Sequence, residues 1–171
     1  MRDLPAHPLT AQAFAPFGDV IEIAGRNGRI INRGTSERFD DLARLDLLEA
    51  GGYPTLNVYR ARGQSLPLPV KVLERHPLSS QSFYPLECRP FLVIVAEPGE
   101  RLTTASIRAF ISNGRQGINY RRGTWHHALV ALTQSTDFLV IERGGPGENC
   151  IEATPDDDVI VTACDIVGDK V

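Results

Sequence analysis

Short apolar or alternating runs recur along the chain from about residue 53 onward, each bounded by Gly, Pro, Asn or Asp. Strands that follow one another every 10 to 15 residues or so, with no helix between them, are typical of an antiparallel sandwich or barrel. The pattern therefore predicts a mainly β fold. The predicted strands are 55–61, 70–76, 91–97, 107–111, 126–132, 137–142 and 159–163.

The run FLVIVAE at 91–97 has no polar face. A strand of this kind is either central in its sheet or covered by another chain. An exposed apolar face would aggregate. We therefore expect a homodimer that buries β surface against a second barrel.

The N-terminal third contains the predicted helical segments. Thr10 can cap a short helical turn that ends at Phe14. Asn27-Gly28 is a hairpin signal between strands at 20–23 and 29–32. A helix is predicted next, because Phe39, Leu42, Leu45 and Leu48 recur every third residue before Gly51-Gly52. From Asp165 onward the sequence resembles a loose tail.

Composition limits the function classes. The chain has 171 residues, 42% of them hydrophobic, which fits one domain over 1–171. Its net charge of −3 argues against nucleic-acid binding. The N-terminus carries no apolar leader, no apolar run suits a membrane, and three cysteines form an odd count, so we expect a cytoplasmic protein with reduced thiols.

A first candidate cluster lies in LERHPLSSQSFYPL at 73–86. Residues of equal parity share a face of a strand, so Glu74 and His76 would continue the apolar face of Val70 and Val72. Pro77 forces a turn that can return Gln81 toward His76. Polar groups at the end of an apolar face suit the mouth of a barrel, although solvated residues at a strand end would have the same pattern.

A second candidate cluster is NYRRGTWHHAL at 119–129. Parity places His126 on the inner face and His127 on the outer face, and the small Ala128 would leave room beside His126. An arginine in the turn before it, Arg121 or Arg122, could hold a carboxylate while the histidine moves a proton. Each histidine taken alone could equally be structural.

The two clusters resemble known motifs. Glu74, His76 and Gln81 resemble the first metal-binding motif of cupins, HxHx4E, and RRGTWH at 121–126 resembles the second, PxGxxH. A closer resemblance, over almost the whole chain, is to the ureidoglycolate lyase family. It is carried by FAPFGDVIE, INRGTSERFDDL, LERHPL, RAFISNGRQGINY, WHHAL and DFLVIERGG, with Ala128 where the family usually has Pro.

The resemblance implies a cupin-like double-stranded β-helix, or jelly-roll, barrel with a short N-terminal helical segment. It also implies cleavage of (S)-ureidoglycolate to glyoxylate and urea by a cytosolic homodimer, with nickel as the associated divalent metal. The cupin positions for a metal are Glu74, His76, Gln81 and His126. No organic cofactor is expected.

Proton transfer is assigned first to His126 and second to His76. Substrate contacts are assigned to Arg122, Arg75, Gln81 and Tyr120, with Arg75 second to Arg122 because its parity points it away from His76. Two other functions stay open: a metal-dependent isomerase or dioxygenase acting on a small carboxylate, and a small-molecule sensor with a cupin barrel.

Overall fold

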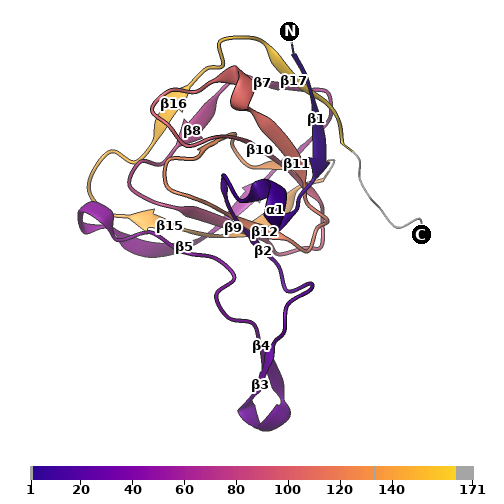
Figure 1. Cartoon of the computed structure of the whole chain (residues 1–171), viewed down its shortest axis with the longest axis vertical. Coiled ribbons are helices and arrows are strands. Elements are labelled where there is room, and N and C mark those ends of the chain that lie inside the picture. Colours follow the sequence, from indigo (N-terminus) through magenta and orange to yellow (C-terminus); the bar gives the residue numbers. More distant parts are fainter. Residues whose placement is uncertain (1, 133, 165–171) are drawn as a thin grey trace.

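The computed structural model describes residues 2–132 and 134–164. Two sheets form most of it, and the single α-helix in this part of the chain is one turn long (Figure 1). The mainly β prediction is confirmed, and the strongly curled larger sheet fits a jelly-roll barrel. No helix in the described segments is long and apolar enough to cross a membrane.

The larger sheet curls on itself. Its main path runs β16-β8-β13-β10-β11-β1-β17-β7, and β14 joins β10 to β6. Its strands are β1 (Arg2–Pro8), β6 (Gly63–Gln64), β7 (Leu68–Val70), β8 (Leu73–Arg75), β10 (Phe91–Ala96), β11 (Arg108–Ile111), β13 (Trp125–His126), β14 (Val130–Leu132), β16 (Ile151–Ala153) and β17 (Val159–Cys164).

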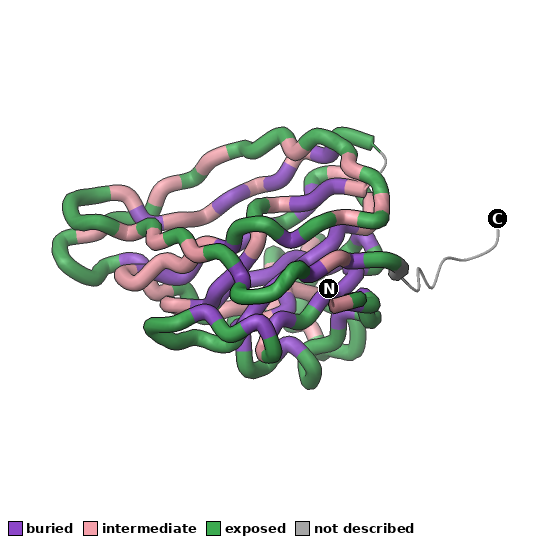
Figure 2. The backbone as a smooth tube through the Cα atoms, turned by 90° about the horizontal axis from the view of Figure 1, so that it is seen from above, coloured by how far each residue is buried: buried purple, intermediate pink, exposed green. Residues whose placement is uncertain are grey.

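The smaller sheet faces the larger one and is antiparallel throughout, in the order β2-β12-β9-β15-β5. Its strands are β2 (Gly18–Ile21), β5 (Tyr53–Ala61), β9 (Gln81–Pro85), β12 (Gly117–Tyr120) and β15 (Thr136–Gly144). Buried positions gather along the strands in the middle of the molecule, and exposed ones gather at the loops (Figure 2).

The position of strand β10 between two core clusters accounts for its apolar sequence. Phe91, Val93 and Val95 join a core cluster shared with the smaller sheet. The alternate residues Leu92, Ile94 and Ala96 join a second cluster within the curl of the larger sheet. All six residues are buried inside one chain. The prediction that this strand is central is therefore confirmed, and its apolar faces give no reason for a partner chain.

Near the N-terminus, one prediction is confirmed and one is wrong. Helix α1 (Ala11–Phe14) is capped by Thr10, whose hydroxyl accepts a hydrogen bond from the backbone N–H of Ala13 at 3.2 Å. The hairpin predicted to turn at Asn27-Gly28 is wrong, because β3 (Arg29–Ile31) pairs with β4 (Ser36–Arg38), which follows it. The pair turns at η1 (Asn32–Gly34), where all three residues have positive φ. This hairpin stands apart from both sheets (Figure 1).

The helix predicted over 39–48 is also wrong, since this segment is irregular, with a positive φ at Asp41 and a bend at 42–43, and only a 3₁₀ turn, η2 (Glu49–Gly51), follows it. Its backbone bonds to side chains of the sheet instead of to itself. The N–H of Arg44 donates to Asp19, the carbonyl of Arg44 accepts from Asn119, and the N–H of Asp46 donates to Ser80. The periodic leucines were a misleading signal, because these sheet side chains satisfy the backbone groups.

Two predicted strands are each broken into two. The run 70–76 divides into β7 and β8, and 126–132 divides into β13 and β14. Because of the first break, Val70 belongs to the core of the larger sheet and Val72 is exposed, so neither forms an apolar face with Glu74. The third 3₁₀ turn, η3 (Thr104–Ser106), precedes β11. The predicted tail from Asp165 lies outside the described residues.

Candidate active site

Three side chains, two on strands of the larger sheet and one just after a strand, lie close together. Glu74 on β8 lies directly opposite His126 on β13, and His76 follows just after β8. One ligand atom of each residue lies within 4.8 Å of the others. The rings of His76 and His126 are 5.0 Å apart between centroids. The structure therefore brings together the histidines of both candidate clusters.

His126 is oriented inward, as predicted. It is 2% exposed, and the ring of Tyr120 from β12 stacks on it at 4.2 Å. Its Nδ1 lies 2.9 Å from the carbonyl oxygen of Thr124, so Nδ1 carries a hydrogen. The other nitrogen, Nε2, is buried and has no hydrogen-bond partner. In the neutral ring, that atom offers a lone pair.

The two residues that follow His126 in the sequence are not buried with it. His127 is half-buried, and its Nδ1 lies 2.8 Å from the carbonyl oxygen of Ala128. Ala128 itself is exposed in the break between β13 and β14. The prediction that Ala128 leaves room beside His126 is therefore wrong, because the strand does not continue that far.

Glu74 and His126 lie close enough for each to affect the pKa of the other. Oε1 of Glu74 lies 3.4 Å from Nε2 of His126, which is an ion-pair distance without hydrogen-bond geometry. The nearby His126 holds the pKa of the Glu74 carboxyl at about 2, whereas burial lowers the pKa of His126. Glu74 is therefore ionised at neutral pH, and burial favours the neutral form of His126.

Cys150 lies on the other side of Glu74. Its thiol donates to Oε2 of Glu74 at 3.4 Å. Burial, and then the contact with Glu74, raises the pKa of this thiol to about 11. A thiol that keeps its proton is a poor nucleophile.

His76 is held from both sides. Its Nδ1 lies 2.6 Å from the carbonyl oxygen of Asn149, and its Nε2 lies 3.1 Å from Oε1 of Gln81. The turn after Pro77 does bring Gln81, the first residue of β9, back to His76 as predicted. Gln81 is 5% exposed.

Glu142 on β15 completes this network, and the sequence analysis missed it. Its carboxylate accepts hydrogen bonds from Gln81 Nε2 at 2.8 Å, Asn57 Nδ2 at 2.8 Å and the Tyr59 hydroxyl at 2.7 Å. Burial and the bond to Glu142 raise the pKa of Tyr59 to about 12. A signal existed: Glu142 continues the buried face of Phe138 and Val140 on its strand.

A small pocket opens beside His76. It has a volume of about 250 Å³, the size of a small metabolite site. Its lining combines acceptors, donors and one imidazole. The lining residues are His76, Ser79, Gln81, Glu142, Arg143, Asn149 and Cys150.

The arginines predicted to bind substrate have other partners. Arg122 pairs with Asp46 at 2.7 Å and with Glu49 at 3.0 Å. The guanidinium of Arg75 lies 5.2 Å from the ring centroid of Trp125, on the opposite side of the sheet from Glu74. Arg143 donates to the carbonyls of residues 49, 50 and 146. Neither Arg75 nor Arg122 lines the pocket beside His76.

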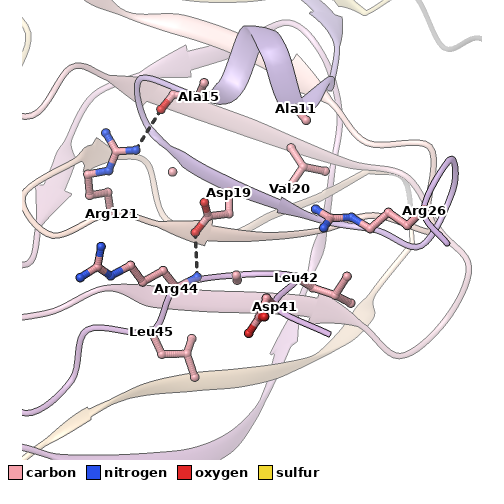
Figure 3. A pocket seen from close by; sticks show the side chains of 12 residues that line it. Ala11, Ala15, Asp19, Val20, Arg26, Asp41, Leu42, Arg44, Leu45 and Arg121 are labelled. Atoms are coloured by element: carbon pink, nitrogen blue, oxygen red, sulfur yellow. Dashed lines mark hydrogen bonds between the residues drawn. The ribbon is translucent and has the colours of Figure 1, made fainter. Parts of the chain in front are cut away.

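A larger hollow lies on the outer face of the smaller sheet, under the 41–46 segment (Figure 3). Its volume is about 650 Å³, and an adjoining hollow of about 520 Å³ contains Arg122. Arg121 donates there to the carbonyl of Ala15 at 3.1 Å. No histidine lines either hollow, so the acid-base groups of the candidate site lie elsewhere.

Glu74, His76 and His126 supply some, but not all, of the ligands that a divalent cation needs. The unpartnered Nε2 of His126 beside the carboxylate of Glu74 is a suitable donor pair. His76 is in the same group, but Gln81 occupies its Nε2. The Gln81 oxygen faces His76, and amide oxygens are weak ligands. The residues therefore fit a weakly held ion better than a closed four-ligand cage.

Comparison with known proteins gives the family. The family model described as ureidoglycolate lyase matches residues 1–162. A protein named ureidoglycolate lyase from Burkholderia mallei (strain NCTC 10229) is 51% identical over 152 residues, 89% of each chain. One of the same name from Pseudomonas fluorescens (strain Pf0-1) is 48% identical, over 89% of this chain and 91% of its own. On this evidence, the chain belongs to the ureidoglycolate lyase family.

Proposed function

We propose that this protein cleaves (S)-ureidoglycolate to glyoxylate and urea, as a carbon–nitrogen lyase in allantoin and purine nitrogen degradation. The observation that carries the proposal is the family match over 1–162, with Glu74, His76 and His126 gathered within the matched region. A pocket of about 250 Å³ suits a substrate of this size.

The reaction needs two proton transfers and no nucleophile. One carbon of the substrate carries a hydroxyl, a carboxylate and a urea nitrogen. Removal of the hydroxyl proton lets the oxygen form the carbonyl of glyoxylate. The C–N bond then breaks, its electron pair stays on nitrogen, and a proton delivered to that nitrogen completes urea.

His126 suits the role of base. Its Nδ1 hydrogen is held by Thr124, and its Nε2 carries a lone pair without a hydrogen-bond partner. This atom is buried 3.4 Å from Oε1 of Glu74 and His126 does not line the pocket beside His76, so the substrate would have to reach past His76 to give it the hydroxyl proton. The lowered pKa keeps the ring neutral and ready to accept it. His76 lines the pocket and is our proposed donor to the departing nitrogen.

Four further residues are proposed to bind substrate. Gln81 lines the pocket, and Tyr120 stacks on the base. Arg122 is the first proposal for the carboxylate and Arg75 the second. Since both have other partners in this structure, the substrate would have to draw one of them away.

Arg122 can be tested directly. Arg122→Lys keeps the charge but loses the two-pronged hydrogen bonding of the guanidinium, so we expect a several-fold rise in KM with little change in kcat. Steady-state kinetics of this variant and of the matching Arg75→Lys variant measure it. An unchanged KM in both would remove both arginines from the site.

The family resemblance implies nickel, and we propose that a divalent ion is held at the cupin positions Glu74, His76, Gln81 and His126. An ion on Nε2 of His126 would occupy the lone pair assigned to the base, so metal binding and proton transfer by His126 would be alternative states of the site. Such an ion would polarise the hydroxyl or carboxylate oxygen of the substrate. The donor set suggests loose occupancy. Metal analysis before and after dialysis against a chelator tests this, and one ion per chain that survives dialysis would contradict it.

Purified protein incubated with racemic ureidoglycolate tests the function. We expect urea and glyoxylate in equal amounts, from one enantiomer, with no oxygen consumed. A metal-dependent dioxygenase would consume oxygen and lose activity on chelation, and a sensor would bind small carboxylates without turnover. Absence of urea release from folded protein would refute the proposal.

We also propose a cytoplasmic homodimer, with free Cys88 and Cys150 in support of a reducing compartment. Because β10 is buried within one chain, the surface that we propose for the dimer is the outer face of the smaller sheet instead. Leu56 and Val58 on β5 are 69% and 59% exposed there. Leu139 pairs with both Val58 and Tyr84, so apolar side chains continue across three strands. A second copy of this apolar face would cover the patch.

A further inference from the structure

Arg143 on β15 is a buried cation without a counter-ion. It is 9% exposed, and no carboxylate in the described part of the chain lies within ion-pair distance of it. A guanidinium stays charged in proteins, and a buried charge is costly unless other groups compensate for it. The hydrogen bonds of Arg143 therefore show which of its hydrogens are left for a ligand.

Three backbone carbonyls fix the guanidinium. Nε donates to the carbonyl of Glu49 at 3.0 Å. Nη2 donates to the carbonyls of Glu49, Ala50 and Pro146 at 2.9, 3.2 and 2.6 Å. Nη1 bonds to no described residue, and it is not one of the unpartnered atoms there that are shut off from solvent. Nη1 is thus a donor held in a fixed position with both of its hydrogens unused.

The chemistry of the pocket beside His76 limits what this donor can meet. Arg143 lines that pocket together with His76, Gln81 and Glu142. The carboxylate of Glu142 accepts three hydrogen bonds, and it would repel a second carboxylate in the same small space. A neutral group that has both an acceptor oxygen and N–H donors suits this lining better than an anion does. The ureido group of ureidoglycolate is such a group.

We propose that the pocket beside His76 takes the ureido end of the substrate and that Nη1 of Arg143 donates to its carbonyl oxygen. This inference rests on the proposed function and leaves the substrate carboxylate to Arg122 or Arg75. When the C–N bond breaks, its electron pair stays on nitrogen and is shared with that oxygen until a proton reaches the nitrogen. A fixed cation at the oxygen stabilises this charge, which the bound substrate does not yet carry. Arg143 itself gives up no proton.

Arg143→Lys removes this donor and keeps the charge. An ammonium has three hydrogens, and the three carbonyls can take all of them. We expect kcat to fall roughly 10²–10³-fold with a much smaller change in KM, because the contact is strongest in the transition state. Arg122→Lys should show the opposite split. Arg2 also donates to backbone carbonyls but does not line the pocket, so Arg2→Lys is the matched control and should keep both constants.

A binding probe tests the contact without turnover. N-carbamoylglycine is the substrate without its hydroxyl, so it carries the same ureido and carboxylate groups. With carbon-13 in its ureido carbonyl, isotope-edited infrared spectroscopy reports the hydrogen bonding of that oxygen. We expect the band at lower frequency in the natural protein and in Arg2→Lys than in water, and loss of this shift in Arg143→Lys. Glycolate, which has no ureido group, should inhibit the natural protein and Arg143→Lys equally.

Several outcomes would overturn the proposal. A natural protein that does not bind the probe, or binds it without the infrared shift, would do so even if no variant folds. So would an Arg143→Lys, folded by circular dichroism, that keeps either kcat or the shift, since Arg143 would then act only by holding its loops. Glycolate weakened as much as the probe would assign Arg143 to the carboxylate instead. A natural protein that shifts the band but releases no urea would refute the proposed function and retain the ureido pocket.

Discussion

At the scale of single residues, the site depends on which atom of each side chain is already occupied. His126 has one nitrogen bound by Thr124 and one without a partner, whereas both nitrogens of His76 face oxygens. Two histidines of one cluster are thereby prepared for different tasks. Burial and hydrogen bonding, more than residue type, separate the two roles.

Paired substitutions test the role of His126. His126→Asn should lower kcat by roughly 10²–10⁴, because the lone pair that takes the hydroxyl proton is lost. His127→Asn should change stability more than kcat, since that ring bonds only at the break after β13. The adjacent position controls for general disruption. A folded His127→Asn without turnover, beside an active His126→Asn, would refute the assignment.

Tyr59 provides a prediction in alkaline solution. Its pKa is raised to about 12, whereas an unfolded chain releases this proton near pH 10. Between these values the folded state binds more protons, so this contribution is present below about pH 10 and is lost as pH rises through about 12. The unfolding free energy should fall more steeply over this range than in Tyr59→Phe, as measured by urea denaturation. Equal slopes would contradict the raised pKa.

At the scale of elements, close contacts between strands and loops decide where the site residues lie. Strand β2 approaches β12 at Gly18, and the irregular 41–46 segment bonds to Asp19 and Asn119 beside it. β12 in turn carries Tyr120 against His126. The edge of the smaller sheet thus supports one wall of the site.

Gly18→Ala tests this support. Gly18 has φ +154°, and a Cβ there would lie 1.9 Å from the backbone oxygen of Asn119. The strand must shift, and we expect a loss of about 1–3 kcal/mol in unfolding free energy. Urea denaturation measures it, with Gly25→Ala, where a Cβ would meet nothing within 4 Å, as the control for positive φ alone. Equal losses in both variants would show that contact at Gly18 is unimportant.

At the scale of the whole molecule, the two sheets leave one apolar face uncovered. Val58 and Leu56 are exposed on β5, which lies at the end of the smaller sheet, while the alternate residues Asn57 and Tyr59 bond to Glu142. The β3–β4 hairpin also extends away from the body, with Ile30 63% exposed (Figure 1). These two features are available to a second copy.

A charge on this face should separate the proposed dimer. Val58→Lys is expected to shift sedimentation from dimer to monomer at micromolar concentration, because a lysine would be buried without a partner. Leu48→Lys, at a residue 73% exposed outside the strands, is the control and should stay dimeric. A monomeric natural protein would refute the homodimer, and a dimeric Val58→Lys would place the interface elsewhere.

The sequence by itself determined the mainly β class, the central position of β10, the inward face of His126 and the return of Gln81 to His76, because alternation along a strand and a proline turn are local properties. The prediction of one domain over 1–171 stays a prediction. Only the tertiary structure decided that 39–48 is not helical, that the strands break at 71–72 and 127–129, and that Glu142 reaches Gln81. The reason is that these outcomes depend on partners distant in the chain. Asp19 and Asn119 satisfy the backbone of Arg44, and β15 brings Glu142 into contact with the amide of Gln81, which lies 61 residues earlier in the sequence.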